Sequence, residues 1–113
     1  REVERAAVAH VRAHFRRLGY VVKSRETENL GYDLDALQKR RMTLHLEVKG
    51  VSGELTRFPI SYNEVERART DRLWQLAIVT KALTTPTLCI VSANRFLREF
   101  ERRPVTYIAW SRF

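Results

Sequence analysis

Residues 42–51 alternate between apolar and polar side chains, and this pattern restricts the fold more than any other feature of the sequence. Leucine or valine occupies the even positions from 44 to 48, whereas His45, Glu47 and Lys49 occupy the odd positions. A period of two is typical of a β-strand with one buried and one polar face, because successive side chains point to opposite sides. The chain is therefore predicted to build a sheet from which Glu47 and Lys49 project together.

A second strand is predicted directly before it, over residues 32–37. Asp33 and Asp35 lie on one face of this strand, opposite apolar residues on the other. The polar and charged residues 38–41 separate the two runs and are typical of a turn, so the strands should form a hairpin. Such a hairpin could bring Asp33 beside Glu47.

Hydrophobic periodicity and capping signals predict the remaining elements. Gly19 ends an amphipathic first helix, and Ser61-Tyr62-Asn63-Glu64 has the capping-box pattern that begins a second one. We expect one α/β domain over residues 1–113, with the order α-β-β-β-α-β-β-α-β. The predicted elements are a helix over 2–18, strands over 20–22, 32–37 and 42–51, a helix over 61–71, strands over 76–80 and 87–92, a helix over 94–102 and a strand over 105–110.

Length and charge set further bounds on the function. The 113 residues suit a single domain, and they include 21 Lys and Arg against 13 Asp and Glu, a formal net charge of +8. Such an excess favours polyanionic partners, above all the phosphate backbone of nucleic acids. No apolar stretch is long enough to span a bilayer and no signal peptide is visible, so a membrane partner is not expected.

The single cysteine, Cys89, lies in the apolar run Leu88-Cys89-Ile90-Val91 and is expected to pack in the core. One cysteine cannot form an internal disulfide, which fits a reducing cytoplasm. The chain begins at Arg1 and not at methionine. We therefore expect a cytoplasmic domain taken from a longer protein.

The residues that could carry chemistry are Asp33, Glu47 and Lys49. Two carboxylates at close range repel each other, and a cation between them removes that repulsion. Mg²⁺ prefers oxygen ligands, usually one or two carboxylates together with waters and a substrate phosphate. A nearby lysine could orient or polarise the attacking water, so these groups suit phosphodiester hydrolysis. The alternative is a solvated hairpin face, on which Glu47 and Lys49 only balance each other's charge.

Asp33 followed by Glu47-Val48-Lys49 resembles the signature of the PD-(D/E)xK nucleases. The predicted order of elements up to residue 80 resembles the core of that superfamily, a restriction-endonuclease-like mixed sheet flanked by helices. One departure is Tyr32 before Asp33, where the signature has proline. More narrowly, the chain looks like the NOV C-terminal-like domain, a nuclease-like module often attached to helicases and restriction systems. That likeness rests on Asn29-Leu30-Gly31-Tyr32-Asp33-Leu34, His45-Leu46-Glu47-Val48-Lys49-Gly50 and Ser61-Tyr62-Asn63-Glu64.

The resemblance implies a role for each residue of the signature. Asp33 and Glu47 would ligate Mg²⁺ or Mn²⁺, with the main-chain carbonyl of Val48 as a further ligand. Lys49 would serve the nucleophilic water. The implied function is a metal-dependent DNA nuclease domain of a restriction, defence or repair protein, beside other domains such as a helicase or an ATPase. Two alternatives of the same fold stay open: a non-catalytic module that binds nucleic acid or a protein, and a homodimer of the Holliday-junction-resolvase type.

Four further candidates have a structural interpretation beside the functional one. Glu4 lies near the middle of the apolar side of the first helix, where the superfamily often has an active-site glutamate, but a wet first-turn carboxylate would also suit the helix dipole. Glu64 and Asn63 follow the expected helix cap, so Glu64 either binds back to the cap amide or supports the site. Asp35 shares a face with Asp33, and we expect an exposed strand-end carboxylate rather than a second ligand.

Other polar and aromatic residues are expected to be structural or to contact phosphate. His10 and His14 could share a metal, but no third ligand of that type is evident, so we expect packed or partly exposed side chains. Trp74 and Trp110 are expected to pack in the core or at its edge. The candidate phosphate contacts, for which solvated loops are the alternative, are Arg57, Lys81 and the Arg40–Arg41 turn.

Overall fold

The computed structural model describes residues 1–105 and 108–112. No helix in this part of the chain is long and apolar enough to cross a membrane. Its regular elements confirm the first eight predicted elements in type and in order. Their bounds are α1 (Glu2–Arg17), β1 (Val21–Ser24), β2 (Leu34–Leu37), β3 (Leu44–Gly50), α2 (Tyr62–Thr70), β4 (Trp74–Thr80), β5 (Thr87–Ser92) and α3 (Ala93–Glu99).

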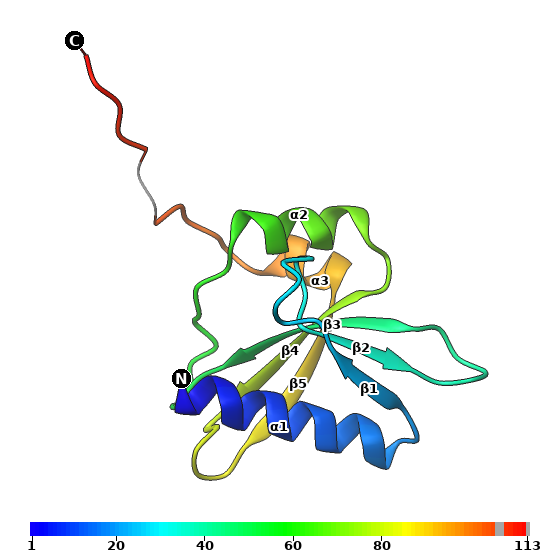
Figure 1. Ribbon diagram of the computed structural model, residues 1–113. Helices are drawn as coiled ribbons and strands as arrows, with labels where there is room; N and C mark the ends of the chain where they lie inside the picture. Colours follow the sequence, from blue (N-terminus) through cyan, green and yellow to red (C-terminus); the bar gives the residue numbers. More distant parts are fainter. Residues whose placement is uncertain (106–107, 113) are drawn as a thin grey trace.

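The strands form one mixed sheet in the order β1-β2-β3-β4-β5. The β3–β4 pair is parallel and the other three pairs are antiparallel. A parallel pair needs a crossover connection, and α2 lies in the one between β3 and β4. Figure 1 shows α1 on one face of the sheet and α2 with α3 on the other. The prediction of a mixed α/β sheet flanked by helices is therefore confirmed.

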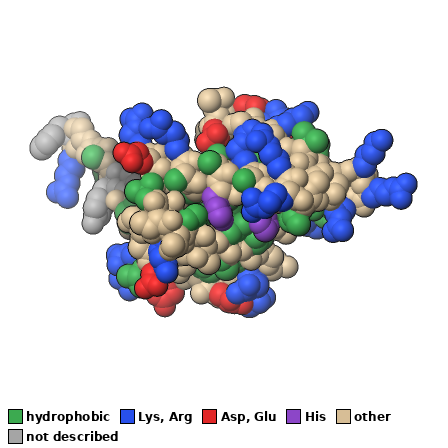
Figure 2. Space-filling view, turned by 90° about the horizontal axis from the view of Figure 1, so that it is seen from below, with side chains coloured by type: hydrophobic (Ala, Val, Ile, Leu, Met, Phe, Trp, Pro, Cys, Tyr) green, Lys and Arg blue, Asp and Glu red, His purple; other side chains and the backbone are tan. Residues whose placement is uncertain are grey.

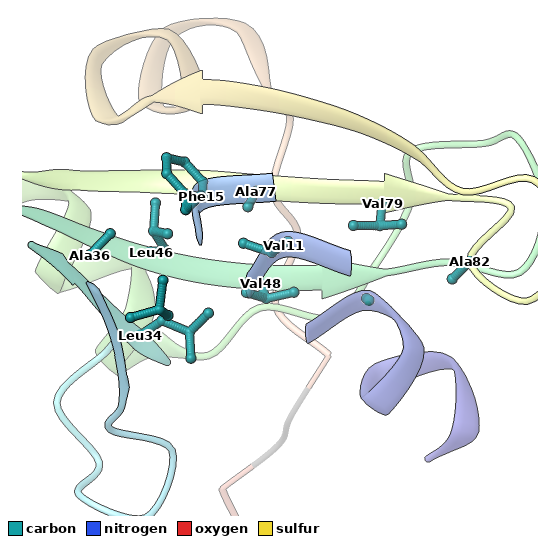
Figure 3. Close-up of a cluster of buried hydrophobic side chains, with 11 residues drawn as sticks. Val11, Phe15, Leu34, Ala36, Leu46, Val48, Ala77, Val79 and Ala82 are labelled. Carbon is teal, nitrogen blue, oxygen red and sulfur yellow. The ribbon is translucent and has the colours of Figure 1, made fainter. Parts of the chain in front are cut away.

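The α1 face of the sheet is covered by the apolar side of that helix. Val11 and Phe15 of α1 are buried against side chains from β2, β3 and β4 (Figure 3). Leu46 and Val48, at the even positions of β3, point into this core, as their alternation predicted. The odd positions of β3 therefore face α2, and this places the polar side chains of the strand beneath that helix.

The α2 and α3 face has a second apolar core, centred on Trp74 and Phe96. Both side chains are almost completely buried, with the indole ring 5.5 Å from the phenyl ring. The prediction for Trp74 is confirmed, whereas the prediction for Trp110 is wrong, because that side chain is 78% exposed. Trp110 lies after α3 in irregular chain that leads away from the sheet (Figure 1).

Two further predictions about the end of the chain differ from the structure. The strand expected over 105–110 is not found in the described part, where Val105 and residues 108–112 form no strand, and residues 106–107 lie outside the described residues. Cys89 was expected in the core, but it is exposed. It lies on β5, an edge strand of the sheet. Val91, next to α3, is buried on this strand, whereas Cys89, nearer the middle of the strand, is exposed.

Candidate active site

Four of the predicted site residues meet on the α2 face of the sheet. Asp33 immediately precedes β2, and its Oδ2 atom accepts a hydrogen bond from the Val48 N–H at 2.8 Å. This hydrogen bond connects Asp33 to β3, the strand that carries Glu47. The candidate active-site cluster, called the active-site cluster from here on, consists of Asp33, Glu47, Lys49 and Glu64.

Lys49 links the strand to helix α2. Its Nζ atom lies 3.2 Å from Glu47 Oε2 and 2.9 Å from Glu64 Oε1. The same Glu64 oxygen accepts the Ser61 N–H at 3.0 Å, and Ser61 Oγ accepts the Glu64 N–H at 3.0 Å. The predicted capping box is therefore present. The structural interpretation of Glu64 is confirmed, and the same carboxylate also contacts Lys49, whereas its role in a functional site stays a prediction.

The strand side of the cluster is buried. Glu47 is 2% exposed, and 15% of the Lys49 side chain is accessible. On a solvated hairpin face both side chains would be exposed to solvent, so the alternative of such a face is wrong for Glu47. Burial and the negative charge of Asp33 raise the pKa of Glu47 to about 9, and Lys49 opposes this shift only in part.

The other three ionisable groups respond to the same surroundings. Burial raises the pKa of Asp33, although the hydrogen bond from Val48 opposes the rise. Burial would lower the pKa of Lys49, but Glu47 and Glu64 outweigh that effect and raise it. Burial would raise the pKa of Glu64, but its bonds to the Ser61 amide and to Lys49 lower it. The cluster thus combines three carboxyl groups with one ammonium group and is short of positive charge.

A small pocket opens beside the cluster, between the chain before β2 and the first turn of α2. Its volume is about 70 Å³, and Lys and Arg are absent from its wall. An opening lined by several carboxyl groups and no basic group favours a cation over an anion. Its wall includes Asp33, Glu47, Glu64, Asn63 and Glu26, the last of which was not among the predicted site residues.

The chain before β2 is fixed in place by contacts with α2 and β4. Asn63 Nδ2 donates to the Asn29 carbonyl at 3.0 Å, and Trp74 Nε1 donates to the Gly31 carbonyl at 2.9 Å. Gly31 has φ +84°, and a Cβ atom there would lie 2.7 Å from the Arg67 Cβ. Only glycine fits this conformation and this approach without strain. These supports for Asp33 were not predicted, except for the indication that Asn63 assists the site.

Asp33, Glu47 and the Val48 carbonyl fit a hard divalent cation. The β2–β3 ladder ends at the Leu34–Leu46 pair, so Val48 lies beyond it. The N–H and C=O of one strand residue point to the same edge, so the Val48 carbonyl faces the side on which Asp33 binds its N–H. No three His, Cys, Asp or Glu side chains in the described ranges are arranged to hold a metal ion. Waters and phosphate oxygens would complete such a coordination shell, as is usual for Mg²⁺.

Comparison with known proteins assigns the family. The family model described as Protein NO VEIN, C-terminal, matches residues 3–91. The chain belongs to this family. The match contains the whole active-site cluster and ends before α3. Searches of the curated proteins and of the solved structures found no match. The narrower resemblance seen in the three motif segments is thereby confirmed.

This NO VEIN C-terminal domain does not bring Glu4 into the cluster. Glu4 is exposed in the first turn of α1, the helix on the opposite face, and its carboxylate forms no hydrogen bond or ion pair with a described residue. A carboxylate in a first helical turn interacts favourably with the helix dipole while it stays in water. His10 and His14 are half-buried as expected, and the His14 ring packs edge-on against Phe15.

Asp35 is part of a second polar cluster, which was not predicted. The expectation that this carboxylate is exposed is wrong, because Asp35 is 7% exposed and accepts a 2.7 Å hydrogen bond from Arg25 Nε. Nothing in the local sequence indicates this partner, which lies ten residues earlier on the far side of a loop. The second polar cluster, as named from here on, consists of Arg25, Tyr32, Asp35, His45, Arg67 and Asp71.

Asp71 is the centre of the second polar cluster. Its Oδ2 atom lies 2.5 Å from His45 Nδ1 and accepts from Arg67 Nε at 2.9 Å, and its Oδ1 accepts the Leu73 N–H at 2.9 Å. The Tyr32 ring stacks on His45 with the centroids 4.3 Å apart. His45 has the same strand parity as Glu47, so the two clusters lie next to each other beneath α2.

Proposed function

We propose that this NO VEIN C-terminal domain is a Mg²⁺- or Mn²⁺-dependent nuclease that hydrolyses phosphodiester bonds of DNA, within a restriction, defence or repair protein. The observation that carries the proposal is the charge of the active-site cluster, in which Asp33, Glu47 and Glu64 share only Lys49. Buried ionised groups are costly unless they are paired. A divalent cation beside the cluster would supply the missing charge.

The architecture supports the proposal. The first carboxylate precedes β2, the Glu-Val-Lys segment lies on β3, and α1 packs on the opposite face of a mixed sheet. This arrangement resembles the restriction-endonuclease-like core of the PD-(D/E)xK nucleases, and we infer that the domain has this fold. The formal net charge of +8 also suits a polyanionic substrate.

Asp33, Glu47 and the Val48 carbonyl would hold the metal ion. When bound, the ion supplies Lewis-acid chemistry at the phosphate and lowers the pKa of a bound water. The hydrogen bond from the Val48 N–H to Oδ2 holds Asp33 in place for this role, and the Asp33 carboxyl group also contacts that of Glu47. Burial of Glu47 keeps bulk water away from the ligand side and strengthens electrostatic interactions there.

Lys49 would position the attacking water. Its ammonium group has three N–H donors, and Glu47 and Glu64 occupy two of them. The third donor is available to hydrogen-bond the water or a non-bridging phosphate oxygen. Attack of the water on phosphorus breaks one P–O ester bond and yields a phosphate monoester and a free hydroxyl group. Glu64, fixed by the Ser61 cap, is the positioning residue for Lys49.

A cleavage assay tests the proposal. Purified protein is incubated with supercoiled plasmid, single-stranded DNA and RNA in Mg²⁺, Mn²⁺ or EDTA. We expect metal-dependent cutting of DNA that Lys49→Ala slows by about 100-fold or more, the usual contribution of a group that assists proton transfer. The matched control is Lys23→Ala, which removes an exposed lysine on the edge strand β1 and should keep the wild-type rate.

The same assay can overturn the proposal. If Lys49→Ala cuts at the wild-type rate, the activity comes from a contaminant or from another site. If the wild-type protein binds DNA but never cuts it in either metal, the non-catalytic binding module is the better description. The mass of the protein in solution separately tests the resolvase-type homodimer.

A further inference from the structure

One end of the molecule carries exposed basic side chains that are not neutralised. This end has five exposed Lys and Arg side chains, and none of them forms an ion pair with a carboxylate in the described part of the chain. By contrast, the basic residues on α2 and α3 all pair with a carboxylate, which is a glutamate for Arg69, Arg95 and Arg98. The basic end, as defined here, consists of Arg16, Arg17, Lys39, Arg40 and Arg41.

The basic end is formed by two segments that the fold holds together. Gln38, which precedes the β2–β3 turn, donates from Nε2 to the carbonyl of Leu18 at the end of α1, at 3.2 Å. The turn itself is closed by a 3.1 Å hydrogen bond from the Arg41 N–H to the Gln38 carbonyl. The C-terminal end of α1 and the tip of the hairpin therefore act as one surface.

Acidic residues are missing from both segments. The sequence has no Asp or Glu between Glu4 and Glu26, or between Asp35 and Glu47. Figure 2 shows the consequence on the face that it presents: the end of the molecule away from the grey residues carries Lys and Arg side chains without Asp or Glu among them. A local field of one sign attracts a polyanion more strongly than the same charges dispersed among carboxylates.

The basic end lies along the hairpin from the candidate active site. Asp33 and Lys39 are the two ends of this path, six residues apart along the β2 strand and its turn. At about 3.3 Å per residue in a strand, the separation is at most roughly 20 Å. Base pairs of B-DNA are stacked about 3.4 Å apart, so this distance corresponds to at most about six base pairs.

We propose that the basic end is a second contact for duplex DNA, which binds the phosphate backbone within about six base pairs of the point of cleavage. This inference rests on the proposed function only in taking DNA as the substrate. Four of the five side chains are arginine, whose planar guanidinium group binds phosphate oxygens in pairs. An anionic membrane is a less suitable partner, because the apolar side of α1 is buried against the sheet and cannot insert into lipid.

Two triple variants with equal charge test the inference. One is Lys39→Gln with Arg40→Gln and Arg41→Gln, and the other is Arg69→Gln with Arg95→Gln and Arg98→Gln; each removes three positive charges from a net +8. Binding to a labelled duplex of about 20 base pairs is measured in EDTA over a salt series, since log affinity falls by about 0.9 per log unit of salt for each neutralised phosphate. EDTA excludes the cutting reaction from the measurement.

The basic-end variant should bind about tenfold or more weakly, with a salt slope smaller by about two to three, as expected for two to three lost phosphate contacts. The α2 and α3 variant should bind nearly as the wild type does. An equal loss in both variants would mean that only net charge matters, and this overturns the inference. It is also overturned if the basic-end variant keeps its DNA affinity and loses binding to phosphatidylserine vesicles instead.

The experiment separates this inference from the proposed function. If the wild-type domain never cuts DNA in metal but the basic-end variant still binds more weakly than its control, the nuclease assignment fails and the DNA contact stands. If the wild type cuts and Lys49→Ala does not, but both triple variants bind DNA equally, the second contact fails and the nuclease assignment stands. Thermal melts of the two variants check that each remains folded.

Discussion

Two clusters of ionisable residues lie side by side beneath α2, and they differ in charge balance. In the second polar cluster, Asp35 and Asp71 meet two arginines and a histidine. In the active-site cluster, three carboxyl groups meet Lys49 alone. Both clusters are largely buried, so burial alone does not distinguish a candidate metal site from a cluster that only stabilises the fold. The balance of charge does, because an unpaired buried carboxylate favours either a proton or an added cation.

The pKa values reflect this difference. Burial would raise the pKa of Asp35, but hydrogen bonds from Arg25 and Tyr32 outweigh it and lower the value. Burial would likewise raise the pKa of Asp71, but bonds from His45, from the Leu73 N–H and from Arg67 lower it. In the active-site cluster the pKa of Glu47 rises instead to about 9. Basic groups of the protein balance the carboxylate charges of the second polar cluster, although Oδ1 of Asp35 has no hydrogen-bond partner among the described residues. The active-site cluster has no such balance of charge.

The largest expected effect comes from removing the centre of the balanced cluster. Asp71→Ala leaves His45, Arg67 and the Leu73 N–H without their acceptor, and should lower the free energy of unfolding by about 3–5 kcal/mol, as when one partner of a buried ion pair is lost. Urea denaturation measures the change. Glu66→Ala on α2, the helix that ends just before Asp71, loses only an exposed pair with Arg69 and should cost less than about 1 kcal/mol. Equal losses of unfolding free energy in the two variants would show that the second polar cluster does not stabilise the fold.

Metal should stabilise the protein through the unbalanced cluster only. At a Mn²⁺ concentration of 100 times Kd, the wild-type free energy of unfolding should rise by about 2.7 kcal/mol, which a thermal melt detects. Asp33→Asn keeps an acceptor for the Val48 N–H and removes the charge, so it should fold normally and lose the response to Mn²⁺. Asp35→Asn, in the second polar cluster, should be less stable but should keep the response. A wild type that is insensitive to Mn²⁺ would end the catalytic interpretation.

In the metal-free protein, the two clusters should change the stability of the fold at opposite ends of the pH scale. Because the folded pKa of Glu47 is about 9, above its ordinary 4.5, the folded protein keeps a proton that the unfolded chain releases, and stability falls as pH rises through this window. Because the pKa values of Asp35 and Asp71 are lowered, their contribution is present above pH 3.8 and is lost as pH falls below it.

Glu47→Gln isolates the first of these effects. The variant should be more stable than the wild type by roughly 1–3 kcal/mol at pH 8 in EDTA, since it removes a group that is costly to ionise when buried. Melts between pH 5 and pH 9 should also show a flatter profile for Glu47→Gln. If both proteins lose stability equally over this range, Glu47 is not the group responsible.

The smallest effect concerns the link between the helix cap and Lys49. Ser61→Ala and Ser92→Ala each remove an N-cap hydroxyl, from α2 and α3 respectively, and each should cost about 1 kcal/mol of unfolding free energy. Only Ser61→Ala should also slow cutting, because Ser61 caps the turn that holds Glu64 against Lys49. Equal cutting rates for the two variants would mean that Glu64 is positioned without its cap.

Prediction from the sequence worked where the pattern is local. The alternation in β3 fixes Glu47 and Lys49 on one face, and the spacing from Ser61 to Glu64 identifies the capping box. It failed for Asp35, because its partner Arg25 depends on how β1 pairs with β2. The bond between Asp71 and His45 joins residues 26 positions apart, and no periodic pattern contains such a contact.

By itself, the sequence determined the order of the elements and the side of the strand from which Glu47 and Lys49 project. Tertiary structure decided what covers that side. The crossover after β3 places α2 over the strand, so Glu47 is 2% exposed and Glu64 reaches Lys49. The physical reason is that periodicity records which side chains share a face, whereas burial depends on the element packed against that face. A charged pair that would be ordinary in water thus becomes part of a buried cluster with more carboxyl groups than basic groups.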